Sequence, residues 1–184
     1  MNKLLLSAAV TLLLTACEQK PDNASSYPTG SDSSAVVGAT SAEEKEERNK
    51  ETALASARAI ATGNMDSVLK DVTADVTDYG DGGGDVIKNK DTLTTMLKSF
   101  ATAFPDWKGD NLMAAADGDY VYVYGDWSGT FKNDFMGMKA TGKPFKFKDV
   151  DIFKFNDQGK IIEHRSIQKF ATMMEQIGAQ PSKK

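Results

Sequence analysis

The sequence is poor in the side chains that bind metals and form disulfides. It has one cysteine, Cys17, and one histidine, His164, among 184 residues. A single cysteine excludes an intramolecular disulfide, and one histidine without a spare thiol leaves only carboxylates for a metal site. No stretch has the spacing of a calcium-binding loop. We therefore expect no bound metal, and we expect Cys17 to have a role other than cross-linking.

Positive charge is also scarce. The formal net charge is −4, whereas binding to nucleic acid relies on Lys and Arg that neutralise phosphates. Residues 80–85 read Gly-Asp-Gly-Gly-Gly-Asp, but they lack the Lys-Ser/Thr pair of a phosphate-binding loop and carry two acids that repel phosphate. We expect a flexible loop at this point, no nucleic-acid partner and no cofactor.

Strongly apolar sequence is confined to the N-terminus. Lys3 precedes an apolar stretch from Leu4 to Leu14, which is too short to span a membrane, since a spanning helix needs roughly 20 apolar residues. Its length is typical of a secretory signal. The next residues, Leu14-Thr15-Ala16-Cys17, resemble the bacterial lipobox. The resemblance implies cleavage before Cys17 and a lipid on its side chain, and the alternative is an ordinary secretory signal with an incidental cysteine.

These features divide the chain into three parts. Residues 1–16 are the predicted signal peptide, and their removal takes away Lys3, so that the formal charge falls from −4 to −5. Residues 17–40 hold the lipidated cysteine and a tether rich in Ser, Asp, Gly, Ala and Pro, whose span as a random coil is on the order of 25 to 30 Å. Residues 41–184 form the predicted domain, held at the bacterial cell envelope, at the outer membrane or periplasmic face in a Gram-negative cell.

Helices are predicted in the first half of the domain. Ser41 and Glu44 have the spacing of a capping box, and apolar residues recur three or four apart in two longer segments. Asp66 is the predicted N-cap of a short helix between them. The predicted helical segments are Ser41 to Thr62, a short one with Met65, Val68 and Leu69, Lys90 to Ala103, and Lys169 to Ile177.

Strands dominate the second half, where apolar and polar residues alternate. The predicted strands are Val72 to Tyr79, Asp119 to Phe131, Pro144 to Phe155 and Gly159 to Gln168. Helices followed by a run of strands indicate an α+β fold, with helices packed on one face of a curved antiparallel sheet.

Four segments in order resemble a known family. They are Phe104-Pro105-Asp106-Trp107, Gly137 to Lys143, Asp151 to Phe155 and Gly159 to His164, and they look like the corresponding segments of SnoaL-like polyketide cyclases in the nuclear transport factor 2-like superfamily. The resemblance implies a cone-shaped α+β barrel with one apolar pocket, often in a homodimer. In the cyclases, an aspartate and a nearby histidine serve acid/base chemistry. Where their pattern continues past the histidine as Trp-Asp, this chain has Arg165-Ser166.

Asp151 and His164 are the candidate catalytic residues. Asp149 and Asp151 lie on the more apolar face of their strand, and a carboxylate there must pair, change its protonation state or face a cavity. A four-residue hairpin loop places Asp151 opposite His164, where it can raise the pKa of the imidazole as in a general base. A loop one residue shorter places Asp151 opposite Arg165 instead, giving a salt bridge and turning His164 away.

The candidate ligand-binding residues are mostly aromatic or uncharged, since such side chains line pockets. The tyrosines that alternate with valines at positions 120–124 fit a ligand cavity or a dimer interface equally well. Met136 and Met138 belong to a segment that fits a pocket lid or a plain surface loop. The predicted ligand-binding residues are Tyr79, Trp107, Tyr122, Tyr124, Phe147, Asp149, Phe153, Ser166 and Gln168.

Three functions remain open on the sequence alone. The first is a membrane-tethered domain that binds one small, largely apolar molecule. The second is a cyclase- or isomerase-type enzyme that uses Asp151 and His164. The third is a non-catalytic module that dimerises or holds an envelope protein.

Overall fold

The computed structural model describes residues 41–179. Among these residues no helix combines the length and the hydropathy needed to cross a bilayer. The predicted signal peptide, the tether and Cys17 lie outside the described residues and stay predictions.

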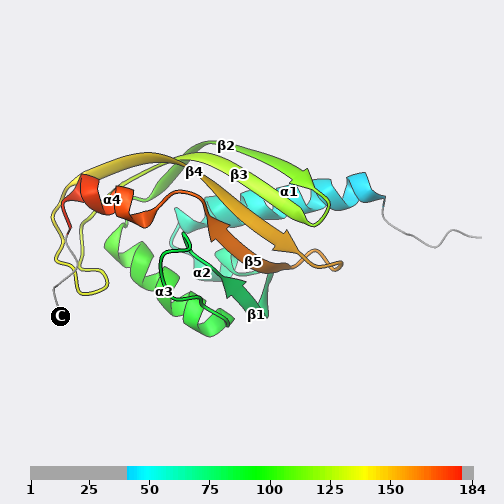
Figure 1. Ribbon diagram of the computed structural model, residues 1–184, viewed down its shortest axis with the longest axis horizontal. Coiled ribbons are helices and arrows are strands. Elements are labelled where there is room, and N and C mark those ends of the chain that lie inside the picture. Colours follow the sequence, from blue (N-terminus) through cyan, green and yellow to red (C-terminus); the bar gives the residue numbers. More distant parts are fainter. Residues whose placement is uncertain (1–40, 180–184) are drawn as a thin grey trace, which may run out of the picture. The chain divides into compact units, whose positions relative to one another are not determined.

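Helices and strands follow the order expected for an α+β domain (Figure 1). Along the chain, two helices precede the first strand and a third follows it. Four strands come next, and the last helix packs against the longest of them. The elements are α1 (Ala42–Ile60), α2 (Met65–Val68), β1 (Val72–Asp78), α3 (Lys90–Ala103), β2 (Lys108–Asp117), β3 (Tyr120–Thr130), β4 (Pro144–Phe155), β5 (Ile161–Ser166) and α4 (Phe170–Ile177).

The strands form one curved sheet in the order β1-β5-β4-β3-β2 (Figure 1). The pairs from β2 to β5 are antiparallel, which confirms the predicted α+β fold with helices on one sheet face. β1 departs from that pattern, because it joins the edge beside β5 in parallel. No strand was expected at β2, whose Gly, Asp, Asn and Ala residues are weak strand formers.

The starts of the first two helices are set by side chains. Ser41 and Glu44 form the predicted capping box, with the Ser41 hydroxyl 3.1 Å from the Glu44 amide and the Glu44 carboxylate 2.8 Å from the Ser41 amide. The predicted cap of α2 is wrong. Asn64, and not Asp66, precedes this helix and accepts a hydrogen bond from the Ser67 amide at 3.1 Å.

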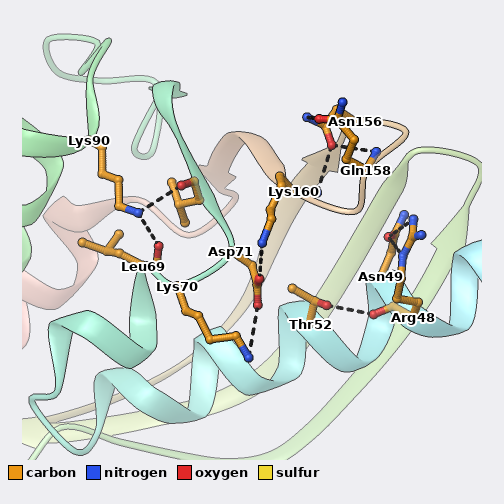
Figure 2. A network of polar contacts seen from close by, with 11 residues as sticks. Arg48, Asn49, Thr52, Leu69, Lys70, Asp71, Lys90, Asn156, Gln158 and Lys160 are labelled. Atoms are coloured by element: carbon orange, nitrogen blue, oxygen red, sulfur yellow. Dashed lines mark hydrogen bonds and ion pairs between the residues drawn. The ribbon is translucent and has the colours of Figure 1, made fainter.

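Polar contacts hold the start of β1 against the start of β5 (Figure 2). The Lys160 ammonium lies 2.7 Å from Asp71, and the Ile161 amide donates to the Asp71 carbonyl at 2.7 Å. Lys90, at the first turn of α3, donates to the carbonyls of Leu69 and Val72 at 2.7 and 3.1 Å. These bonds fix where β1 enters the sheet, and with it the place of Asp78 at the far end of the same strand.

Buried apolar side chains gather in two clusters. One lies between α1, α2, β1 and the middle of the sheet, and its fully buried members include Val76, Val121, Val123, Phe155 and Ile161. The other lies beneath α4 and includes Phe104, Phe131, Phe145, Met173 and Ile177. Trp107 and Phe147 are only partly buried and pack against both clusters.

Candidate functional site

A cavity of about 990 Å³ extends between the two clusters. Its walls come from the inner face of β3 to β5, from α1 to α3, and from α4. Most of the lining side chains are aliphatic or aromatic, and polar groups are concentrated where β1, β4 and β5 meet. A large apolar cavity with a few converging polar groups is the usual form of a small-molecule site.

The polar end of the cavity is built around His164. Its Nδ1 lies 3.1 Å from Asp78 Oδ2, and its Nε2 lies 3.3 Å from Asp151 Oδ1. β1 supplies Asp78, which pairs directly with His164 in the parallel register, and β4 supplies Asp151. The side chains of Asp78, Asp151 and His164 are 8, 18 and 24% exposed. We call these three residues the Asp-His-Asp cluster.

The predicted closeness of Asp151 and His164 is confirmed, but neither predicted register is correct. Asp151 lies opposite Ser166, and Phe153 lies opposite His164. The register shifts by one residue between Lys154 and Phe155. Asp151 therefore pairs with a residue of β5 that neither the longer nor the shorter loop would place opposite it. Because the displacement leaves His164 on the inner face, it meets Asp151 as a diagonal neighbour.

Two carboxylates change the protonation of His164. Burial lowers its pKa, but the hydrogen bonds and negative charges of Asp151 and Asp78 outweigh burial and raise the pKa to about 10. His164 therefore carries two ring protons at neutral pH, and it can donate one to each carboxylate. The catalytic role expected for His164 stays a prediction, and in this charge state the imidazolium would act as an acid.

The two carboxylates differ in their own titration. Burial raises the pKa of Asp78, but the hydrogen bond and charge of His164, together with the Gly80 amide, outweigh burial and leave that pKa below its usual value. For Asp151 burial dominates, and its pKa lies above its usual value despite the bond from His164. Asp78 is thus a fixed counterion, while Asp151 binds a proton more readily than Asp78 does.

Asp149 has a different role from Asp151. Its carboxylate is buried and accepts hydrogen bonds from the Ser166 hydroxyl and from the amides of Ile167 and Gln168, at 3.2 and 2.7 Å for the amides. These bonds hold the bend between β5 and α4. Asp149, Ser166 and Gln168 all line the cavity, as predicted, and their binding of a ligand stays a prediction.

The aromatic candidates separate into two groups. Tyr79, Trp107, Phe147 and Phe153 line the cavity, and the Arg165 guanidinium lies over the Tyr79 ring at 4.5 Å. The expectation that Tyr122 and Tyr124 line the cavity is wrong, because the inner face of β3 carries the intervening valines. The tyrosines lie on the outer face, where Tyr120 and Tyr122 are 36 and 39% exposed. An interface between two copies through this face stays a prediction.

Two loops complete the cavity wall. Residues 80–85, read from the sequence as a flexible loop, are tied to the start of α4, because Asp81 accepts hydrogen bonds from the amides of Gly83 and Phe170, both at 2.8 Å. Met136 and Met138 also line the cavity. Met138 is buried, whereas Met136 is 75% exposed.

The sequence did not point to Asp78 as a site residue. It is the last residue of β1 and meets His164 only because β1 lies beside β5 in parallel, across a separation of 86 residues. No local pattern reports such a pairing. The one sequence feature that could have indicated Asp78 is its position next to Tyr79, a predicted ligand-binding residue.

The cluster has the groups needed to move a proton. No group of three or more His, Cys, Asp or Glu side chains within residues 41–179 has the geometry to hold a metal ion. Asp151 can accept a proton, His164 can donate one, and Asp78 holds the imidazolium in place. Such carboxylate and imidazole pairs contribute typically 10²–10⁴-fold to proton-transfer reactions.

Known structures share this fold at low sequence identity. A candidate polyketide cyclase from Xanthomonas campestris pv. campestris superposes with a TM-score of 0.66 at 16% identity, covering 72% of this chain and 98% of its own. A candidate SnoaL-like polyketide cyclase from Jannaschia sp. CCS1 gives 0.64 at 22%, covering 74% and 95%. AclR, a candidate hydroxylase from Streptomyces galilaeus, gives 0.62 at 20%, covering 72% and 97%.

Family assignment comes from the sequence itself. No curated protein matches the chain. The family model described as SnoaL-like polyketide cyclase matches residues 50–177, which include nearly all of the cavity lining and all three residues of the Asp-His-Asp cluster. The chain belongs to the SnoaL-like polyketide cyclase family.

Proposed function

We propose that this domain binds one small, largely apolar molecule in its cavity, and that a lipid on Cys17 holds it at a membrane. The observation that carries the first part is the apolar cavity of about 990 Å³ with a polar cluster at one end. The volume is in the range of small-molecule sites, which run from roughly 300 to 1,000 Å³. The Asp-His-Asp cluster then orients the polar part of the ligand.

Filling the cavity is expected to abolish binding. Ala57 of α1 is buried and lines the cavity, so Ala57→Phe places a ring in the space that the ligand needs. Ala55, on the same helix, is exposed, and Ala55→Phe is the matched control. The chain has two tryptophans, Trp107 and Trp127, and both line the cavity. Energy transfer from them to the neutral probe N-phenyl-1-naphthylamine measures occupancy in the full-length protein.

We expect the probe to bind the unmodified protein and the Ala55→Phe variant alike, and Ala57→Phe at least about 10-fold more weakly, a change of about 1.4 kcal/mol. Equal binding by Ala57→Phe and the unmodified protein would show that the probe lies outside the cavity. Absence of energy transfer in every variant would count against the binding function.

A second candidate function is proton transfer within the bound molecule, and the Asp-His-Asp cluster favours it. The Asp151 carboxylate would take a proton from the carbon next to a carbonyl group, and negative charge would then develop on the carbonyl oxygen. The positive charge of the His164 imidazolium would stabilise that oxygen. Asp78 would keep the imidazolium in position. This is the cyclase- or isomerase-type chemistry expected from the sequence, with Asp151 as the base in place of His164.

Deuterium exchange into a ketone tests this chemistry. We expect the full-length protein to accelerate the exchange of the acidic C–H protons of 2-tetralone in D₂O, followed by NMR, and Asp151→Asn to reduce the acceleration about 10²-fold, because it removes the base. Asp75→Asn makes the same change at an exposed position of β1 and is expected to keep full activity. An unmodified protein that exchanges no faster than Asp151→Asn contradicts the proposal.

The membrane anchor depends on Cys17 alone. We expect Cys17→Ser to move most of the protein from membrane to soluble fractions, since the single thiol that can carry the lipid is removed. The thermal unfolding of residues 41–179 is expected to stay unchanged, because every residue of the described fold is retained. Fractionation followed by immunoblotting measures the distribution, and a protein that stays in the membrane fraction contradicts lipidation at Cys17.

A further inference from the structure

The walls of the cavity carry mainly negative charge. Among the described residues, its titratable lining includes two bases, His164 and Lys169, and Lys169 already donates to the carbonyl of Asp81 in the loop that precedes α3. The acids outnumber them. They are Asp78, Asp81, Asp85, Asp149, Asp151 and Glu175. A cleft lined by one sign of charge concentrates ions of the opposite sign.

The Asp-His-Asp cluster has more acids than bases. It combines two carboxyl groups with one imidazole, so with both carboxylates ionised it keeps a net negative charge even when His164 is protonated. Asp151 gives one oxygen to His164 Nε2, and its other oxygen accepts no hydrogen bond from the described residues. Its side chain is 18% exposed, and Asp151 lines the cavity. Asp151 therefore has an oxygen without a hydrogen-bond donor among the described residues that is available to a ligand in the cavity.

Aromatic rings stand next to these carboxylates. On the inner face of β4, Phe147, Asp149, Asp151 and Phe153 follow one another, and the four residue steps from Phe147 to Asp151 span roughly 13 Å. The Trp107 ring lies 5.9 Å from that of Phe147 and 4.8 Å from that of Phe100. Phe100, Trp107 and Phe147 are all half-buried and line the cavity. Ring faces attract organic cations, most strongly where water is excluded.

We propose that the ligand is an organic cation: an apolar molecule that carries an alkylated ammonium group, with this group against Asp151 and the apolar part against Phe147 and Trp107. An anion would be repelled by the acidic wall, and a neutral molecule would gain no charge–charge attraction to the Asp151 carboxylate. This inference rests on the proposed function, because it names the class of molecule that the same cavity binds.

Two probes of equal shape separate charge from size. Trimethylphenylammonium and tert-butylbenzene have the same outline, and differ in a positive nitrogen in place of a carbon. Their binding to the full-length protein is measured by the fluorescence of Trp107 and Trp127, both of which line the cavity. We expect the cation to bind at least 10-fold more tightly than its neutral isostere. Asp151→Asn is expected to reduce this ratio to near one, and the exposed control Asp75→Asn is expected to preserve it.

A second variant keeps every charge. Phe153→Leu removes the ring that follows Asp151 on the inner face of β4, and we expect it to weaken the cation several-fold more than the neutral isostere. It tests the inference even if Asp151→Asn fails to fold, which thermal unfolding would reveal.

The outcomes distinguish the two proposals. If tert-butylbenzene binds as tightly as the cation, the inference is overturned and the binding function stands. If neither probe changes the fluorescence, the binding function fails with it. If Asp151→Asn folds and keeps the full preference for the cation, the placement of the ammonium at Asp151 is overturned.

Discussion

Raising the pH from 7 to 10 is expected to destabilise the folded protein by an amount that depends on His164. The pKa of this group is about 10 in the folded state and 6.5 in an unconstrained chain. A raised pKa stabilises the fold fully below the unfolded value and loses that contribution as the pH rises through the folded value. For a shift of this size we expect a loss on the order of 3 to 5 kcal/mol.

The expected loss can be assigned to one residue. Thermal unfolding of the unmodified protein and of His164→Gln is compared at pH 7, 8, 9 and 10, and the difference between the two curves removes contributions that both proteins share. The lysines whose pKa is raised by ion pairs, such as Lys45 and Lys154, lose their contribution only above pH 10.5. We expect the pH dependence in this window to disappear in His164→Gln.

NMR gives a direct check, because His164 is the only histidine in the chain. One ring resonance then reports one titration. We expect Asp78→Asn and Asp151→Asn each to lower its pKa, since each removes one of the two carboxylates, and we expect Asp75→Asn to leave it unchanged. A resonance that titrates near 6.5 in the unmodified protein would refute the charge state on which the assignment of Asp151 as the base depends.

Local signals predicted the parts of this fold that local physics determines. The capping box at Ser41, the helix Lys90–Ala103 and the strand Pro144–Phe155 have the predicted bounds, because caps, the period of a helix and the alternation of a strand are written within a few residues of one another. The strand Lys108–Asp117 was missed for the same reason. It is an edge strand with an irregular register near Asn111. Its residues alternate in burial but only weakly in hydropathy, so no clear strand pattern appears in the sequence.

The site was predicted only in part, because its geometry depends on register and on distant pairing. Asp151 and His164 meet in a register shifted from both that simple turns would give. Asp78 reaches them through a parallel pairing of β1 with β5 that no local pattern encodes. The prediction that Tyr122 faces the cavity was wrong for a similar reason. Alternation separates the two faces of a strand, but it does not show which face the helices cover.

Gly109 illustrates a role for a residue that the sequence could not reveal. It lies opposite Trp127 in the β2–β3 pair, and a Cβ atom added at Gly109 would lie 2.5 Å from Cζ3 of that indole. A Cβ atom at Gly125 would lie 3.1 Å from Cε2 of the same ring. The two glycines thus leave the space that the Trp127 indole occupies, which we call the glycine seat. The Trp107 ring stacks on this indole with ring centroids 5.4 Å apart.

Gly109→Val is expected to destabilise the protein by about 3 kcal/mol, because the added atoms force the Trp127 ring out of its seat and toward the cavity. The sign is informative. Valine is favoured over glycine in strands by up to about 1 kcal/mol, so without the indole the same change would stabilise the sheet. Chemical unfolding measures the free energy, and energy transfer to N-phenyl-1-naphthylamine is expected to fall together with it.

Gly84→Val is the matched control for this prediction. Gly84 lines the cavity, but a Cβ atom there would meet nothing within 4 Å, and its backbone is not in the left-handed region. We expect this variant to unfold within about 0.5 kcal/mol of the unmodified protein, as surface substitutions usually do. If Gly109→Val is as stable as Gly84→Val, the indole is free to move, and the glycine seat does not fix the aromatic wall of the site.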